Sequence, residues 1–258
     1  MADSEAAAVV GPGVGPGKTL AIVLCAGQGS RMGAAQNKIF LPLAGMPVGA
    51  RAIAAFQHAP QVDEIIAIAH RDELERIRSQ LLAPFAFTKV SHVVAGGESR
   101  HQSERRALEA VRERITAGEI ALVMIHDGAR PLVSGDEIAR LVEVVRGLPQ
   151  PGGALLATPV TADERIARIT ADDGVVEQLF AASELARAQT PQGFGARALL
   201  AAYDRAARDG FEGTDTASVM EAAGGLVVVV PGDEANLKVT TPDDLLRAEA
   251  ILQARGQP

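Results

Sequence analysis

The residues best suited to chemistry in this sequence lie in a glycine-rich loop that follows an apolar run. The run spans residues 20–24, and the loop after it contains Gly27 and Gly29. An apolar run that ends in glycines indicates a buried strand leading into a tight turn, where successive backbone N–H groups can surround an anion. Arg31 and Lys38 add two fixed positive charges nearby. This is the layout expected where a triphosphate is held and its charge is neutralised.

Two better-known phosphate loops do not match this sequence. In the loop of residues 27–33 the last glycine comes one residue too late for the dinucleotide-binding pattern G-x-G-x-x-G. Residues 13–19 approach the P-loop pattern, but Pro12 occupies the position of its first glycine, and a strand rather than a helix follows. We therefore interpret the Ala/Gly/Pro-rich residues 1–18 as a disordered leader.

Apolar runs alternate with helical periodicity through the first 157 residues. Strands are expected at 20–24, 65–69, 90–95, 121–125 and 154–157, and helices near 48–57, 71–82, 101–115 and 134–145. This alternation predicts the α/β class, with a mostly parallel sheet between two helical layers. Ligands in such folds bind beyond the carboxyl ends of the strands. A second glycine turn at 96–100 and Asp127 both follow strands, so we expect them to share one cleft with the first loop.

Residues 158–187 break this rhythm. Residues 165–169 alternate in polarity, residues 172–174 form a turn signal, and residues 175–179 continue as a second run, which together predict a β-hairpin. An isolated hairpin is marginally stable in water. It must pack against something, and a second copy of the chain related by a twofold axis is the simplest partner.

Composition limits the classes of function. The net charge of −7 and the 3% aromatic content argue against a nucleic-acid-binding surface. Cys25 is the single cysteine, so an intrachain disulfide is excluded and a cytoplasmic location fits. The N-terminus lacks the basic and apolar regions of a signal peptide, and no stretch has the ~20 apolar residues of a membrane-spanning helix. We therefore expect neither nucleic acid nor membrane as a partner.

Four motifs in order carry a resemblance to a known family. They are the loop 27–33 with Lys38, residues 126–131 (HDGARP), residues 189–194 (QTPQGF) and residues 238–240 (KVT). Together they resemble the 2-C-methyl-D-erythritol 4-phosphate cytidylyltransferase family over residues 19–254. The resemblance implies one Rossmann-like domain of the nucleotide-diphospho-sugar transferase type. It also implies that residues 158–187 form an arm that joins a homodimer and reaches the partner's active site.

The implied reaction is attack of a polyol phosphate on the α-phosphorus of CTP, with pyrophosphate as the leaving group. The nucleophile is already an anion, so positioning and charge neutralisation replace a general base. The resemblance assigns Arg31 and Lys38 to charge stabilisation and Lys238 to the acceptor phosphate. Mg²⁺ is implied because triphosphates bind as metal complexes, and no residue is assigned as a direct metal ligand.

The resemblance also assigns the binding residues. The nucleotide-binding set is Ala26, Gly27, Gly29, Gly97, Glu98 and Ser103. The acceptor-binding set is Asp127, Arg130, Thr214 and Lys238.

The sequence departs from the family pattern in the expected arm and before Lys38. Asp163 replaces a substrate-contacting threonine, Ala182 replaces an arginine that helps to place the acceptor phosphate, and Asn37 replaces a proline. A carboxylate at 163 would repel a phosphorylated acceptor unless a cation intervenes. The candidate compensating residues are Arg165, Arg168 and Arg187.

Several other functions stay open at this point. The same chemistry could serve another polyol phosphate, such as ribitol 5-phosphate, or another base, as in molybdenum-cofactor or sugar activation. A CTP-binding homologue without turnover is a different class, and the two arm departures are compatible with it. An NAD-dependent oxidoreductase is the least favoured alternative because the glycine spacing does not fit.

Overall fold

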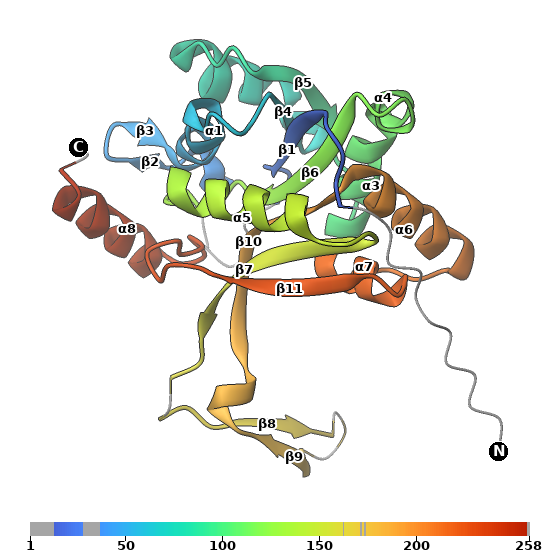
Figure 1. Cartoon of the computed structure of the whole chain (residues 1–258). Helices are drawn as coiled ribbons and strands as arrows, with labels where there is room; N and C mark the ends of the chain where they lie inside the picture. Colours follow the sequence, from blue (N-terminus) through green and yellow to red (C-terminus); the bar gives the residue numbers. More distant parts are fainter. Residues whose placement is uncertain (1–12, 28–36, 162, 171, 173, 257–258) are drawn as a thin grey trace.

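A seven-stranded sheet forms the centre of the protein, with strand order β11-β7-β10-β6-β1-β4-β5 (Figure 1). The computed structural model describes residues 13–27, 37–161, 163–170, 172 and 174–256. The sheet strands are β1 Lys18–Leu24, β4 Glu64–Ala69, β5 Val90–Ala95, β6 Ile120–Asp127, β7 Gly152–Pro159, β10 Ala186–Gly195 and β11 Leu226–Pro231. β1 pairs in parallel with both β4 and β6, and β4 pairs in parallel with β5. The predicted α/β class with a mostly parallel sheet is confirmed.

β10 is the exception, because it runs antiparallel to both β6 and β7. Residues 189–194 of this strand form one of the family motifs, and no strand is expected there from the sequence. The segment contains Pro191 and Gly193, which are depleted in strands, so its pattern gives no strand signal. The register of its pairing with β7 shifts between Ala188 and Gln192, and this irregularity accommodates the proline.

Helices cover both faces of the sheet. They are α1 Val48–His58, α2 Leu74–Arg76, α3 Arg100–Ala110, α4 Arg112–Thr116, α5 Gly135–Gly147, α6 Ala196–Asp209, α7 Thr216–Ala222 and α8 Pro242–Ala254. Short helical turns are η2 Lys38–Phe40, η3 Arg71–Glu73, η4 Ile77–Leu82, η5 Ala83–Phe85 and η6 Ala182–Glu184. The single helix expected over 71–82 is therefore a succession of shorter turns.

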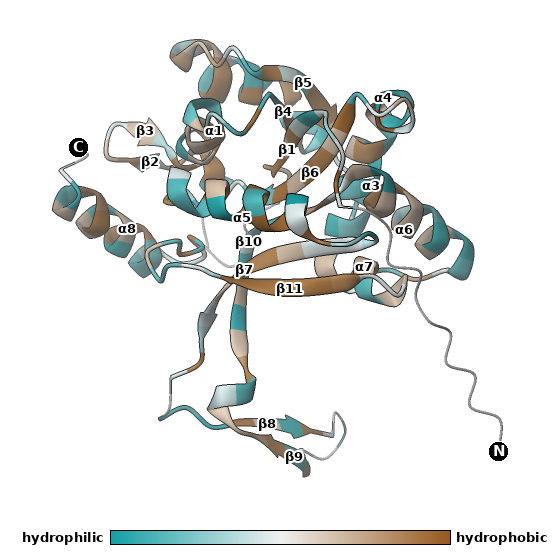
Figure 2. Cartoon of the chain, viewed as in Figure 1, coloured by the Kyte–Doolittle hydropathy of each residue, from teal (hydrophilic) through white to brown (hydrophobic). Residues whose placement is uncertain are grey.

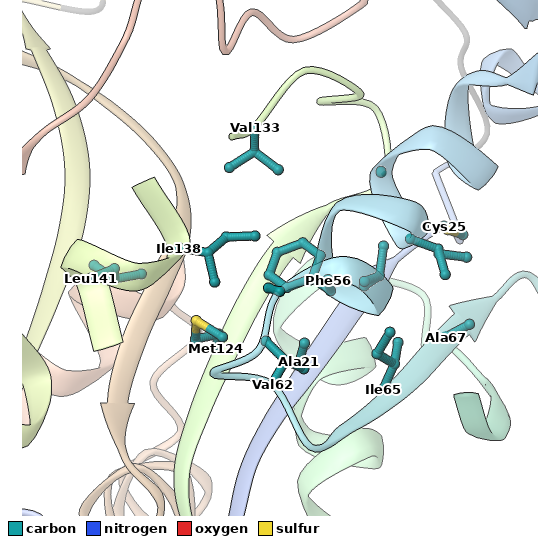
Figure 3. Close-up of a cluster of buried hydrophobic side chains, with 14 of the residues drawn as sticks. Ala21, Cys25, Phe56, Val62, Ile65, Ala67, Met124, Val133, Ile138 and Leu141 are labelled. Carbon is teal, nitrogen blue, oxygen red and sulfur yellow. The ribbon is translucent and has the colours of Figure 1, made fainter. Parts of the chain in front are cut away.

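The alternation along β1 produces two separate cores. Ala21 and Val23 belong to a core on one face with Phe56 of α1 and residues of α5. Figure 3 shows Ala21 and Phe56 of this core with Ile138 and Leu141 of α5. Leu20 and Ile22 point to the opposite face, where they pack with α3, α4, α6 and α7. Because side chains alternate across a strand, every residue of 20–23 is buried, and each large side chain contributes about 1.5–3 kcal/mol. This burial fixes the ends of the central strands, where the glycine turns begin.

A third, smaller core attaches the C-terminal segment. Leu237 and Val239 pack with α8 and with Leu43 of the small hairpin β2 Pro42–Leu43 and β3 Met46–Pro47. The start of α8 is fixed by its own residues, because Thr241 and Asp244 form a capping box and Pro242 occupies the first helical position. These contacts hold residue 238, which lies between two buried side chains, near the carboxyl end of β6.

The segment 158–187, here called the arm, projects away from the sheet (Figure 1). Its tip is the two-stranded antiparallel sheet of β8 Ile166–Ile169 and β9 Val176–Phe180, so the predicted hairpin is confirmed. Figure 2 shows hydrophobic residues along both of these strands. Leu179 is 70% exposed and Ile169 is 56% exposed.

The predicted leader is partly ordered at its end. β1 begins at Lys18, and the Arg146 guanidinium of α5 donates to the carbonyls of Gly15 and Gly17. Residues 15–18 therefore pack against the domain, whereas residues 1–12 lie outside the described residues. Among the helices that the structure describes, none is long and apolar enough to cross a membrane.

Candidate nucleotide and acceptor site

A cavity of about 680 Å³ lies at the carboxyl ends of the central strands. The segments that line it are the end of β1, the turn at Lys38, the second glycine turn, the end of β6 and the segment after β11. Its lining residues are Leu24, Ala26, Gly27, Lys38, Ile39, His70, Arg71, Gly96, Gly97, Glu98, Ser99, Arg100, Ser103, Asp127, Ala129 and Lys238. The expected cleft that joins the two glycine turns and Asp127 is therefore present.

The second glycine turn is held closed by the start of α3. Ser99 caps this helix, and the Ser103 hydroxyl donates to the Ser99 carbonyl at 2.8 Å while accepting from the Gly97 N–H at 3.0 Å. A Cβ at Gly97 would lie 2.3 Å from the Cβ of Gln102, so only glycine fits there. The buried Ser103 thus shapes the turn, and its hydroxyl is already engaged on both sides.

Asp127 is the centre of a buried charge cluster. The Lys238 Nζ lies 2.7 Å from its Oδ2, the Arg100 Nη1 donates to its Oδ1, and the Arg130 Nε lies 3.9 Å from Oδ2. Burial alone would raise the pKa of Asp127, but the charges of Arg100 and Lys238 outweigh it and hold this pKa well below its usual range. The carboxylate is therefore ionised at every pH at which the protein would work.

A second layer of hydrogen bonds positions this cluster from behind. The Asp127 N–H donates to Thr190 Oγ1 at 3.0 Å, and Thr190 Oγ1 lies 3.2 Å from His126 Nδ1. His126 Nε2 lies 3.0 Å from the Arg130 carbonyl, which can only accept, so Nε2 carries the proton and the Thr190 hydroxyl donates to Nδ1. Burial lowers the pKa of His126 to about 4, which keeps the ring neutral.

Two further hydrogen bonds connect three of the sequence motifs in space. The Asn236 side chain donates to the Thr190 carbonyl at 2.9 Å, and Arg130 donates to the Asn236 carbonyl at 2.6 Å. The motifs at 126–131, at 189–194 and before Lys238 are thereby joined in one network. Arg130 serves this network behind Asp127 and is not among the residues that line the cavity.

Lys38 reaches the cavity from η2, and Asn37 fixes the start of this turn. The Asn37 side chain accepts from the Ile39 N–H at 3.3 Å, and its amide donates to Glu73 Oε2 at 2.8 Å and to the Cys25 carbonyl at 3.4 Å. Asn37 therefore caps η2 and connects it to the end of β1. Asn37, which stands where the family has a proline, therefore has a structural role of its own.

The predicted site residues divide into three groups. Those that line the cavity are Ala26, Gly27, Lys38, Gly97, Glu98, Ser103, Asp127 and Lys238. Arg130 stands behind the cavity, and Thr214 precedes the α7 cap Asp215 and is absent from the lining. Gly29 and Arg31 lie outside the described residues, so their assignment stays a prediction.

Sequence reasoning missed Arg100, which lines the cavity and pairs with Asp127. Its position directly after the second glycine turn, at the carboxyl end of a strand, is the signal that could have identified it. Its partner Glu104 is four residues away on the same helix, a spacing that favours an ion pair.

The described residues do not form a metal cage. Among them, no group of three or more His, Cys, Asp or Glu side chains could hold a metal ion. The Asp127 carboxylate, which lines the cavity, is occupied by cationic partners. These residues therefore do not fit a site in which the protein alone would coordinate Mg²⁺.

The comparison with known families agrees with this geometry. The family model of 2-C-methyl-D-erythritol 4-phosphate cytidylyltransferase (IspD) matches residues 19–254. The chain belongs to this family.

Individual IspD relatives match along nearly their whole length. The relative from Geotalea uraniireducens is 41% identical over 92% of this chain and 97% of its own, and the relative from Geobacter metallireducens is 38% identical over 91% and 97%. The solved 4-diphosphocytidyl-2C-methyl-D-erythritol synthase structure from Anaerococcus prevotii has a TM-score of 0.75 at 26% identity and covers 92% of this chain and 96% of that chain. The resemblance stated from the motifs is confirmed.

The other two departures from the IspD pattern, Asp163 and Ala182, lie in the arm and do not line the cavity. Ala182 begins η6, and Asp163 has its pKa lowered by a hydrogen bond from Thr161. Of the candidate compensating cations, Arg187 pairs with Glu164, and Arg168 lies over the Phe180 ring at 5.6 Å. The Arg165 Nη1 donates to the Glu164 carbonyl at 3.1 Å. Each of the three therefore has contacts within the arm of its own chain.

Proposed function

We propose that this protein transfers a cytidylyl group from CTP to 2-C-methyl-D-erythritol 4-phosphate, releasing pyrophosphate. The observation that carries this proposal is the cavity itself. In a chain of the IspD family, it places Lys38 and the second glycine turn beside Asp127 and Lys238. Both substrates need cations, and the cavity lining offers them from separate segments of the chain, with Lys38 in η2 and Lys238 after β11.

The chemistry requires positioning and charge neutralisation. An oxygen of the acceptor phosphate forms a bond to the α-phosphorus of CTP, and the bond from that phosphorus to the bridging oxygen breaks with its electrons on pyrophosphate. Lys38, together with Arg31, is proposed to stabilise the charge that builds up on the phosphorus oxygens. No residue has to remove a proton, because the attacking phosphate is already anionic.

Lys238 and Asp127 are proposed to receive the acceptor. The Lys238 side chain is 41% exposed and can leave Asp127 for a phosphate, whereas Asp127 is an acceptor for the hydroxyl groups of a polyol. The backbone of Ala26, Gly27 and Gly97, with Glu98, would meet the base and ribose. Mg²⁺ is proposed to arrive as part of the CTP complex and to be held by phosphate oxygens and water.

The arm is proposed to join two copies of the chain. Its exposed apolar residues support this proposal, because a two-stranded hairpin of this kind needs a surface to cover it. These residues are Ile166, Ile169, Val175, Val176 and Leu179. The homodimer, the absence of nucleic acid and membrane partners, and the cytoplasmic location remain predictions.

The test is pyrophosphate release from purified protein supplied with CTP, Mg²⁺ and 2-C-methyl-D-erythritol 4-phosphate. We expect turnover that falls about 10²–10³-fold in Lys238→Ala and in Arg31→Ala, as for loss of a single charge-stabilising donor. Lys18→Ala, which removes a lysine from an exposed pair with Glu119, is the matched control. Turnover with ribitol 5-phosphate alone would overturn the proposed identity of the acceptor. Preference for ATP, GTP or UTP would overturn the proposed specificity for cytosine. CTP binding without turnover would favour a non-catalytic homologue.

A further inference from the structure

Arg100 connects the two halves of the cavity. It is the first residue of α3, directly after the turn expected to hold the nucleotide, and its Nη1 reaches Asp127 at the end of β6. Its Nε donates to Glu104 Oε1 at 2.7 Å. The guanidinium is thus shared between a carboxylate on the acceptor side and a carboxylate on its own helix.

A buried network holds the Glu104 end of this arrangement. The Glu104 side chain is 1% exposed, and it accepts from the Tyr203 hydroxyl of α6 and from Thr216 Oγ1 of α7 at 2.9 Å. Three helices therefore fix the carboxylate that orients Arg100. Because the planar guanidinium is held on two edges before any ligand binds, little side-chain entropy remains to be lost when the site is used.

The two close cations on Asp127 differ in exposure and in anchoring. Lys238 contacts Oδ2 with a side chain that is 41% exposed, whereas Arg100 contacts Oδ1 with a side chain that is 25% exposed and anchored by Glu104. A phosphate that enters the cavity can draw Lys238 away. A buried carboxylate that loses one cation tends to protonate unless another remains in contact.

We propose that Arg100 is a positioning residue: it keeps the Asp127 carboxylate ionised and correctly oriented while Lys238 engages the acceptor phosphate. The ionised Asp127 then accepts a hydrogen bond from an acceptor hydroxyl, and the anchor at Glu104 keeps Arg100 from following Lys238. This inference rests on the proposed function, since it assumes a phosphorylated polyol beside Asp127.

The groups that face Asp127 determine how its ionisation should respond. They are Arg100 from α3, Arg130 from the turn after β6, Lys238 from the segment after β11, and the neutral His126 on β6 itself. Lys38 lines the same cavity from η2. Without Arg100, the close contact to Oδ1 is lost, and only Lys238 and the more distant Arg130 oppose the effect of burial. The pKa of Asp127 should then rise.

The experiment compares Arg100→Gln and Arg100→Lys with Arg105→Gln, a control that removes an exposed arginine from the same helix. We expect Arg100→Gln to raise KM for the polyol phosphate about 10–100-fold, as for a lost charged hydrogen bond, with KM for CTP nearly unchanged. It should also shift the acid limb of the kcat/KM profile for the acceptor to higher pH. Arg100→Lys should recover part of both effects.

A direct titration separates this proposal from the proposed function. The pKa of the Asp127 carboxyl, followed by carbon-13 NMR, should be higher in Arg100→Gln than in the wild type, whether or not the wild type turns over this acceptor. An unchanged pKa in folded Arg100→Gln, or in the equally uncharged Arg100→Met if the first variant fails to fold, would overturn the positioning role. Equal rises in both KM values with an unshifted pH profile would also overturn it.

Discussion

The charge cluster at the strand ends and the arm differ in how their side chains are covered, although β10 contributes to both. Residues 189–195 of β10 are buried in the sheet and contribute Thr190 to the network behind Asp127. Residues 186–188 of the same strand are exposed and enter the arm. The cluster therefore has its partners within one chain, whereas the arm presents apolar side chains that one chain leaves uncovered.

The ion pairs of the two regions differ in the same way. The Asp127 and Arg100 side chains are 9% and 25% exposed, so breaking the contact between them leaves a buried charge with less compensation. In the arm, Arg187 and Glu164 are 44% and 39% exposed, and water can replace either partner. Geometry inside the cluster should therefore control activity, while the arm should act through what it binds.

The largest effect should come from Asp127→Asn. Removing this charge releases Lys238 and leaves the cations of the cluster without their shared anion, so we expect kcat/KM for the acceptor to fall about 10²–10³-fold. Steady-state pyrophosphate release measures this, with the exposed Asp136→Asn as control. A loss below about threefold would mean that the cluster does not control activity, and the contrast with the arm would fail.

His126, in the network behind Asp127, should make the stability of the protein depend on pH. Burial lowers its pKa to about 4, so between pH 6.5 and 4 this residue binds a proton in the unfolded chain but not in the folded chain. Stability therefore falls as the pH falls through this window, by up to about 3 kcal/mol from this residue. Denaturant unfolding from pH 7 to 4 should show a steeper loss in the wild type than in His126→Gln.

The exposed His58→Gln is the matched control for this measurement, because it should retain the wild-type slope. Parallel stability profiles for the wild type and His126→Gln would show that the His126 ring is not held neutral. In that case the tautomer that connects Thr190 to Arg130 would be wrong.

The sequence predicted the parts of this molecule whose physics is local. The apolar run of 20–24, the helix near 134–145 and the paired strands of the arm hairpin each depend on patterns of a few residues, and all three are present in the structure. β10 was missed because Pro191 and Gly193 obscure its pattern, and its pairing comes from distant neighbours.

Arg100 was missed for a related reason. Its role depends on Asp127, 27 positions away in the sequence, and on Tyr203, which is further still. Nothing in the local residue pattern connects these side chains. The resemblance assigned half of the residues that line the cavity, and it also assigned Thr214, which the cavity lining does not include.

The arm's apolar face gives the next prediction. Leu179→Asp should weaken association of two chains, because each copy would lose about 1.5–3 kcal/mol of burial and gain a desolvated charge. Light scattering after size-exclusion chromatography should show a shift towards monomer, with activity reduced at low protein concentration. Leu246→Asp on α8, also an exposed leucine, is the control. A wild-type protein that is already monomeric would contradict this role of the arm.

The smallest effect should come from Arg187→Ala, and its size tests the comparison most directly. Because Arg187 and Glu164 are both more than a third exposed, we expect the free energy of unfolding to change by less than about 1 kcal/mol. Arg100→Ala, which removes the cationic partner of the buried Glu104 and one of the two close cations of Asp127, should cost about 3–5 kcal/mol by the same denaturant measurement. If the two variants lose equal stability, burial does not distinguish the cluster from the arm. If Arg187→Ala is stable but raises KM for the acceptor, then Arg187 supplies the cation that the family places at residue 182.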